Sequence, residues 1–198
     1  MVLGVDPKRN QGNAIAVELL HLAEKPVLVA QSGVAPCSAV VGIDFRASSL
    51  RAAELAARMV GREGRIHLVH VKPSLDFPAA SVWGWDPCYE YALEGAFDGL
   101  ARALQDIGVA EVQRHCRSGD PAAELMAAAE ELDADLVAIG SDGYICNGRV
   151  VVGRVAREVL SDATMSVLAT PVAMSLDGGL GVITERAEAA APTVVEGP

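Results

Sequence analysis

The 198-residue chain is poor in aromatic residues and in basic residues. Phe, Trp and Tyr make up 4% of it, and 16 Lys and Arg stand against 26 Asp and Glu, which gives a formal net charge of -10. A surface with this excess of negative charge repels nucleic acids and anionic membranes. We therefore expect neither as a partner, and a bound anion would need local donors such as backbone N–H groups.

The sequence also lacks the patterns of a zinc site, a disulfide framework and a membrane span. Its four cysteines are scattered, without a C-x-x-C pair or a Cys/His cluster at zinc-like spacing. It has no apolar run of about 18 residues, and the N-terminus lacks the order of a signal peptide. These absences predict reduced thiols, no metal site of this kind, no membrane partner and a cytoplasmic location.

Apolar residues are plentiful, at 51%, and from residue 38 onward short apolar runs alternate with segments of helical spacing. The expected strands are residues 38–44, 65–71, 111–117, 134–140 and 165–171, and the expected helices are residues 48–60, 88–108, 119–133 and 151–163. Asp120 is the expected N-cap of the third helix and Pro121 its first residue. Apolar strands that alternate with helices predict an α/β fold of three layers, with a doubly wound open sheet of five parallel strands.

The first 31 residues resemble a later part of the same chain. Residues 16–29 match residues 156–169 at six of fourteen positions, which are Ala16, Glu18, Leu20, Ala23, Val27 and Leu28. Upstream, LGVD at 3–6 resembles IGSD at 139–142. The match predicts a partial repeat made of a strand, a helix and a strand, although any two such pieces rich in Ala, Val and Leu match to some degree. Because this piece lacks further strands, we expect it to dock on the complete domain or on another chain.

The chain therefore divides into four predicted parts. Residues 1–31 form the partial repeat, residues 32–37 a linker and residues 38–171 the complete domain. Within that domain, residues 72–87 form an irregular insert with three prolines and both tryptophans. Residues 172–198 turn to Gly, Ala, Glu and Pro, a composition that predicts a disordered tail.

A glycine-spaced loop follows the fourth expected strand of the domain. Gly140 and Gly143 are followed by nine residues, then by Gly153 and Arg154. Glycines let the backbone come close to phosphate oxygens, and the N–H groups at the start of a helix favour negative charge. Three glycines at this spacing, between an apolar strand and a helix, indicate a phosphate-binding loop.

Four stretches carry a wider resemblance, and they are VVGIDFRASSLRAAELAARM, IHLVHV, GDPAAELMAAAEELDADLVAIGSDG and VAREVLSDATMSVLATP. In order and spacing, they resemble the universal stress protein family over residues 38–171. The resemblance implies a role in the stress response, the strand order 3-2-1-4-5, and dimers or tandem pairs joined through the fifth strand. For members of one subfamily, the resemblance also implies that ATP binds at the ends of the strands. Residues 1–31 are similar to the end of a preceding domain in tandem members.

The ATP-binding subfamily has the signature G-x2-G-x9-G-[S/T], and this sequence departs from it at the last place, where Arg154 stands. By resemblance, Asp44 matches the acidic residue that contacts the nucleoside, and Val71 matches the strand residue whose backbone contacts the base. The implied nucleotide-binding residues are therefore Asp44, Val71, Gly140, Gly143, Gly153, Arg154 and Val155.

Arg154 leaves two interpretations open. Its guanidinium can replace the missing hydroxyl as a charged donor, with Arg46 and Arg149 nearby. Alternatively, it points to solvent or fills the site with its own side chain. A cation at a helix N-terminus is unfavourable by about 0.3–1 kcal/mol, so we expect some compensation for its charge. Asp142 can hold Mg²⁺ on a triphosphate or cap the loop, and we favour the cap.

The favoured hypothesis is a universal-stress-type regulatory module that binds ATP or another adenine nucleotide, with Mg²⁺ as a candidate companion ion. We expect no enzyme beyond slow ATP hydrolysis, because no residue pair is organised for fast turnover. The alternative is a dimerising interaction protein that binds no nucleotide and has a degenerate phosphate loop. In either case the expected partner is the chain itself, as a homodimer or as a tandem pair joined through the fifth strand.

Overall fold

The computed structural model describes residues 2–4, 16–18, 20, 25–31, 33–72, 87–141, 144–146 and 149–171. Within them, seven strands form one sheet with the order β1-β2-β9-β6-β3-β4-β5. These strands are β1 (Val2–Gly4), β2 (Val27–Ala30), β3 (Ser38–Gly42), β4 (Arg65–Lys72), β5 (Glu111–Ser118), β6 (Leu136–Ser141) and β9 (Ser166–Pro171).

Five of these strands, β5, β4, β3, β6 and β9, are parallel neighbours. In chain order they are the third, second, first, fourth and fifth strands of the domain, the order that the family resemblance implied. Most residues of β3, β6 and β9 are buried, as expected of apolar strands covered on both faces. The predicted α/β fold is confirmed.

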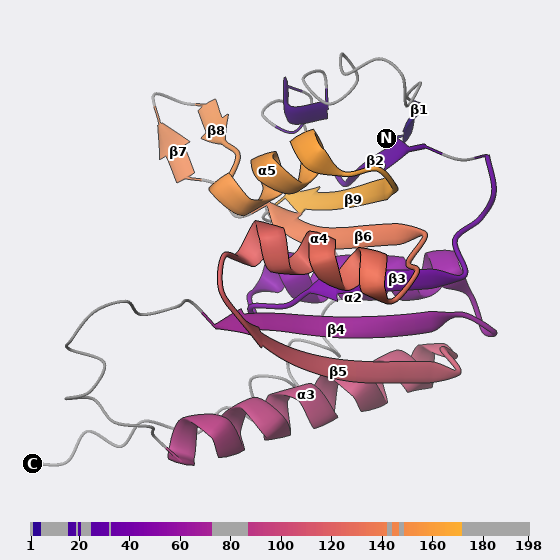
Figure 1. Cartoon of the computed structure of the whole chain (residues 1–198), viewed down its shortest axis with the longest axis vertical. Coiled ribbons are helices and arrows are strands. Elements are labelled where there is room, and N and C mark those ends of the chain that lie inside the picture. The colour runs from indigo at the N-terminus through magenta and orange to yellow at the C-terminus, as the bar shows by residue number, and fades with distance from the viewer. Residues whose placement is uncertain are drawn as a thin grey trace, which may run out of the picture.

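Helices cover both faces of the sheet (Figure 1). They are α2 (Ala47–Val60), α3 (Pro87–Ile107), α4 (Pro121–Glu131) and α5 (Arg154–Asp162). On one face, Leu50 of α2 and Leu104 of α3 are buried in one apolar cluster. On the other, Leu125 of α4 and Val159 of α5 are buried in a second cluster. The chain thus builds three layers with the sheet in the middle.

The start of α4 follows a local sequence signal, whereas the start of α5 does not. Asp120 caps α4, and Pro121 is its first residue, as predicted. The predicted last helix, residues 151–163, begins too early, because α5 starts at Arg154. In its place β8 (Arg149–Val151) pairs antiparallel with β7 (Tyr144–Cys146), so the glycine-spaced loop holds a small two-stranded sheet of its own.

The N-terminal strands extend the sheet beyond β9. β2 runs antiparallel to β9, with Leu28 opposite Leu168. Because these leucines are equivalent positions in the sequence match, the two strands meet as two copies related by a two-fold axis would meet. β1 pairs in parallel with β2 and places Val2 opposite Leu28, as β6 places Ala138 opposite Leu168.

The N-terminal piece also shares the core of the domain. Residues 16–18 and 20 are helical, and Ala16 and Leu20 are buried in the cluster that contains Val159 and Leu160 of α5. The described part of this piece therefore docks on the same chain. Its interpretation as a partial repeat, and the domain boundaries, stay predictions.

Several predicted features lie outside the described residues. They are Asp142, Gly143, most of the insert at 72–87 with its tryptophans, and the tail at 172–198. Among the helices of the described part, none combines the length and the hydrophobicity that crossing a membrane requires.

Candidate functional site

A cavity of about 230 Å³ lies at the carboxyl edge of the sheet, between the ends of β3, β4 and β6. Ligands of open parallel α/β sheets bind at this edge. The cavity is lined by Gly42, Ile43, Asp44, Ser49, Val69, His70, Val71, Pro121, Leu125, Ile139, Gly140 and Val155. Three helices, α2, α4 and α5, thus contribute residues beside the three strands.

Four of the seven predicted site residues line this cavity, and they are Asp44, Val71, Gly140 and Val155. They come from four different parts of the fold, which the strand order brings together. Gly153 is the N-cap of α5, and no described side chain caps this helix. Gly143 lies outside the described residues.

Asp44 is held by a turn between β3 and α2. Its Oδ1 accepts a hydrogen bond from the N–H of Arg46 at 3.0 Å and one from the hydroxyl of Ser49 at 2.5 Å. The Nε of Arg46 lies 3.8 Å from the other carboxylate oxygen. Phe45 takes a left-handed backbone conformation, with φ 62°, and its ring packs edge-on against Phe97. The carboxylate is therefore held in position, yet half of its side-chain surface, 50%, stays open to solvent.

Gly140 allows α2 to approach the end of β6 closely. A Cβ at this position would lie 2.4 Å from the Oγ of Ser48 and 2.8 Å from the amide nitrogen of Ser49. The buried hydroxyl of Thr170 donates a hydrogen bond to the carbonyl oxygen of Ser48 at 2.6 Å and so fixes the start of α2 against β9. This glycine thus has a packing role, whether or not a phosphate also approaches it.

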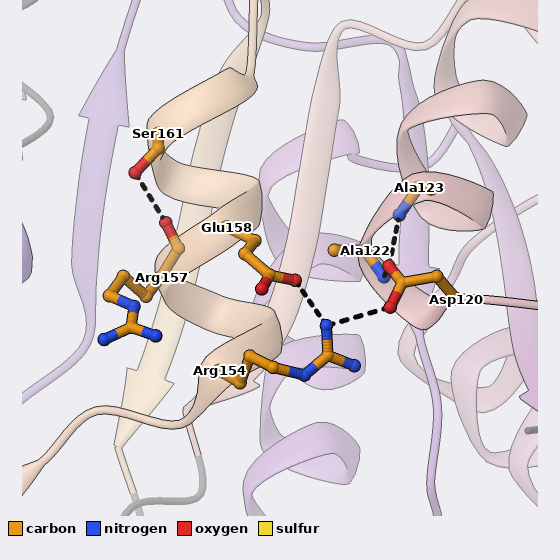
Figure 2. Close-up of polar contacts among 7 residues, drawn as sticks. All are labelled: Asp120, Ala122, Ala123, Arg154, Arg157, Glu158 and Ser161. Atoms are coloured by element: carbon orange, nitrogen blue, oxygen red, sulfur yellow. Dashed lines mark hydrogen bonds and ion pairs between the residues drawn. The ribbon is translucent and has the colours of Figure 1, made fainter.

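Arg154 reaches from the start of α5 to the start of α4 (Figure 2). Its Nη1 donates to Oδ2 of Asp120 at 2.8 Å and to Oε2 of Glu158 at 2.7 Å. Asp120 first, and then Glu158, raise the pKa of Arg154. The N–H of Ala123, followed by Arg154, lowers the pKa of Asp120. The guanidinium is not among the cavity-lining groups, so it does not plug the site.

The other two predicted arginines are placed differently. Arg46 pairs with Asp44, whereas the side chain of Arg149 lies outside the described part of the chain. Both described arginines are thus engaged by carboxylates at the rim of the cavity. Within the described residues, no group of three or more His, Cys, Asp and Glu could hold a metal ion.

Sequence reasoning missed several cavity residues. His70, which was not among the predicted site residues, lines the cavity and donates from Nδ1 to the carbonyl oxygen of Ile43 at 2.7 Å. Ser49, Pro121 and Leu125 also line it. Ser49 was the most accessible of these from sequence, because it lies five residues after Asp44 at a predicted helix start.

A family model described as the universal stress protein family matches residues 38–171. The match covers more than half of the chain and all of the cavity-lining residues. The chain belongs to the universal stress protein family. A comparison with curated proteins found no match.

Solved structures share this fold. A universal stress protein from Archaeoglobus fulgidus DSM 4304 superposes with a TM-score of 0.59 at 19% identity, and this chain, matched over 86% of its residues, spans 59% of that protein's length. Hypothetical protein MJ0577 gives a TM-score of 0.57 at 19% identity, with 72% of this chain and 100% of that chain covered. A universal stress protein in complex with cAMP gives 0.50 at 23% identity, with 69% and 98% covered.

Proposed function

We propose that this chain is a regulatory module that binds an adenine nucleotide at the carboxyl edge of its sheet. The observation that carries the proposal is the cavity itself. In it, Asp44, Val71 and Gly140 meet around one hollow, although they are far apart in the sequence.

The lining of the cavity suits a nucleoside. Val69, Leu125 and Ile139 offer an apolar surface on which a flat base can rest. The carboxylate of Asp44 can accept hydrogen bonds from ribose hydroxyls. The start of α5 has no side-chain cap among the described residues, and the free N–H groups at such a start favour a phosphate.

The choice of an adenine nucleotide draws on a relative. One solved universal stress protein of the same fold is in complex with cAMP. That observation concerns the relative, and it makes adenine nucleotides the first ligands to test here, with and without Mg²⁺.

We further propose that the module acts by binding rather than by turnover, with slow ATP hydrolysis as its upper limit. Nδ1 of His70 donates to the carbonyl oxygen of Ile43 at 2.7 Å. Asp44, the carboxylate of the cavity, is engaged by Arg46 and Ser49. These contacts support roles in holding a ligand rather than in activating a nucleophile.

The test measures binding of AMP, ADP and ATP to the purified chain, by equilibrium dialysis and by thermal unfolding. Ligand at 100 times its Kd stabilises the folded state by about 2.7 kcal/mol, which raises the melting temperature. The Asp44→Asn variant keeps the Oδ1 acceptor of the turn but loses the charge. We expect it to bind about tenfold more weakly, the loss typical of one charge-assisted hydrogen bond.

Asp98→Asn is the matched control. It removes the same charge from a carboxylate of α3 that pairs with Arg114 on the edge strand β5 and does not line the cavity. We expect this variant to bind as the unchanged chain does. If no nucleotide alters the melting temperature of the unchanged chain, the proposal is wrong.

The alternative, a dimerising interaction protein without a nucleotide, is favoured by one observation. Arg154 replaces the hydroxyl of the family signature, and in this structure Asp120 and Glu158 already engage it. Absence of binding in the experiment above, together with self-association of the chain, would support this alternative.

A further inference from the structure

We infer that the cavity selects a nucleoside with one phosphate over nucleoside di- and triphosphates, and that Arg154 with its two carboxylate partners sets this preference. The inference rests on the proposed function, because it concerns the same cavity. It adds the class of ligand and the residues that determine it.

Two donor nitrogens of the Arg154 guanidinium take no part in its ion pairs. Both of its ion pairs use Nη1, as Figure 2 shows. Among the described residues, Nε and Nη2 have no hydrogen-bond partner, and 51% of the side-chain surface is exposed. A guanidinium carries five N–H donors in a planar fork, and one edge of the fork matches one phosphate group. The unused edge of Arg154 therefore offers one phosphate a charged partner.

The ion-pair bridge lies next to the cavity, and its carboxylates, Asp120 and Glu158, line a neighbouring hollow between α4 and α5. Val155, which follows Arg154, lines the cavity, and so does Pro121, which follows Asp120. The bridge therefore spans the gap between the starts of α5 and α4, beside the cavity. The cavity volume of about 230 Å³ is below the 300–1,000 Å³ typical of small-molecule sites. A nucleoside that fills this cavity would hold its phosphate outside it, and we place that phosphate beside the bridge.

The charges at the rim favour a single phosphate. Asp120 and Glu158 carry two negative charges against the one positive charge of Arg154. The first phosphate pairs with the open edge of the guanidinium. Of the other arginines described near the cavity, Arg46 is already paired with Asp44, and Arg157 points away from the bridge (Figure 2). Each further phosphate therefore adds negative charge near two carboxylates. Like charges at this range repel, so di- and triphosphates bind more weakly.

The experiment compares Kd values of adenosine, AMP, ADP and ATP for the full chain by isothermal titration calorimetry, without divalent metal. We expect AMP to bind about tenfold more tightly than adenosine and about tenfold more tightly than ATP, because a single charge-assisted hydrogen bond or a single like-charge repulsion has an effect of this size. The Arg154→Ser variant loses the phosphate partner, so AMP should fall to the affinity of adenosine. Glu158→Gln removes one opposing charge, so ATP should bind about tenfold more tightly while adenosine is unchanged.

Two control variants separate the bridge from bulk charge. Arg157→Ser makes the same change of charge as Arg154→Ser, on the same helix but away from the bridge. Glu111→Gln makes the same change of charge as Glu158→Gln, on β5 at the far edge of the sheet. Both should keep the AMP and ATP affinities of the unchanged chain. Equal effects of Arg154→Ser and Arg157→Ser, or unimproved ATP binding in Glu158→Gln, would overturn the role of the bridge.

The failures of the two proposals are distinguishable. If the unchanged chain binds ATP as tightly as AMP, the proposed function stands and the preference for one phosphate is wrong. If neither adenosine nor any of its phosphates binds, the proposed function fails, and the inference fails with it.

Discussion

At the scale of the residue, close packing at the carboxyl edge depends on the absence of a side chain at Gly140. The Ser48 hydroxyl and the Ser49 amide occupy the space that a Cβ would need. We expect Gly140→Ala to lower the free energy of unfolding by about 1–3 kcal/mol, the usual cost of overpacking. Urea unfolding at neutral pH measures this change.

Gly95 provides the control for this substitution. It lies within α3, and a Cβ there would meet nothing within 4 Å. Gly95→Ala should therefore stabilise the chain by about 0.5–1 kcal/mol, because alanine favours a helix interior. If both variants shift stability in the same direction, the close approach of α2 to β6 is not the cause.

Two histidines on neighbouring strands give the chain a pH dependence. Nδ1 of His67 lies 3.3 Å from Nε2 of His115. Burial first, then the nearby His115 and Arg65, lower the pKa of His67, and burial, then Arg117, lowers the pKa of His115. The unfolded chain therefore takes up protons at a higher pH than the folded chain does. The free energy of unfolding should therefore be highest above about pH 6.5 and should decrease as the pH falls below this value.

Urea unfolding at several pH values between 7.5 and about 5 tests this dependence. Asp120 and Glu131 do not contribute to the dependence in this pH range, because their pKa values are lowered and their carboxylates take up protons only in more acidic solution. His67→Gln should flatten the dependence. An equally steep dependence in this variant would assign it to other groups.

At the scale of the element, the helical residues before β2 belong to the core of the domain. Leu20 is 1% exposed and packs in the cluster that contains Val159. We expect Leu20→Ala to lower the free energy of unfolding by about 2–5 kcal/mol, the range for a leucine deleted from a core. Val34→Ala, at a side chain that is 77% exposed, should change it by less than about 0.5 kcal/mol. Similar values for the two variants would show that the N-terminal piece is not docked.

At the scale of the whole molecule, β2 covers the edge of β9. The pairing is centred on Leu28 and Leu168, as in an association of two equivalent strands. Removing residues 1–31 would leave β9 as an open edge, and open edges pair with other chains. We expect this shortened chain to self-associate at concentrations where the full chain does not, as measured by light scattering after gel filtration. An unchanged mass and unchanged stability would contradict a capping role for the N-terminal piece.

The elements of the fold were largely predictable from the sequence, and the candidate site was predictable in part. The apolar runs gave each strand of the domain within about two residues, and Asp120-Pro121 gave the start of α4. The start of α5 was missed because residues 149–151 pair with a second short strand instead of joining the helix. Four predicted site residues line the cavity, but His70 reaches it from a strand whose local pattern carries no such signal. Ser49 was indicated only by its position five residues after Asp44.

The sequence by itself determined the alternation of strands and helices, because this pattern depends on neighbours two to four residues apart. It also contained the match between residues 16–29 and 156–169. Only the tertiary structure decided that β2 runs antiparallel along β9, and that Arg154 pairs with Asp120, 34 positions away. The partner of a charged side chain depends on which helix starts the sheet brings together, and no local pattern in the chain encodes that distance.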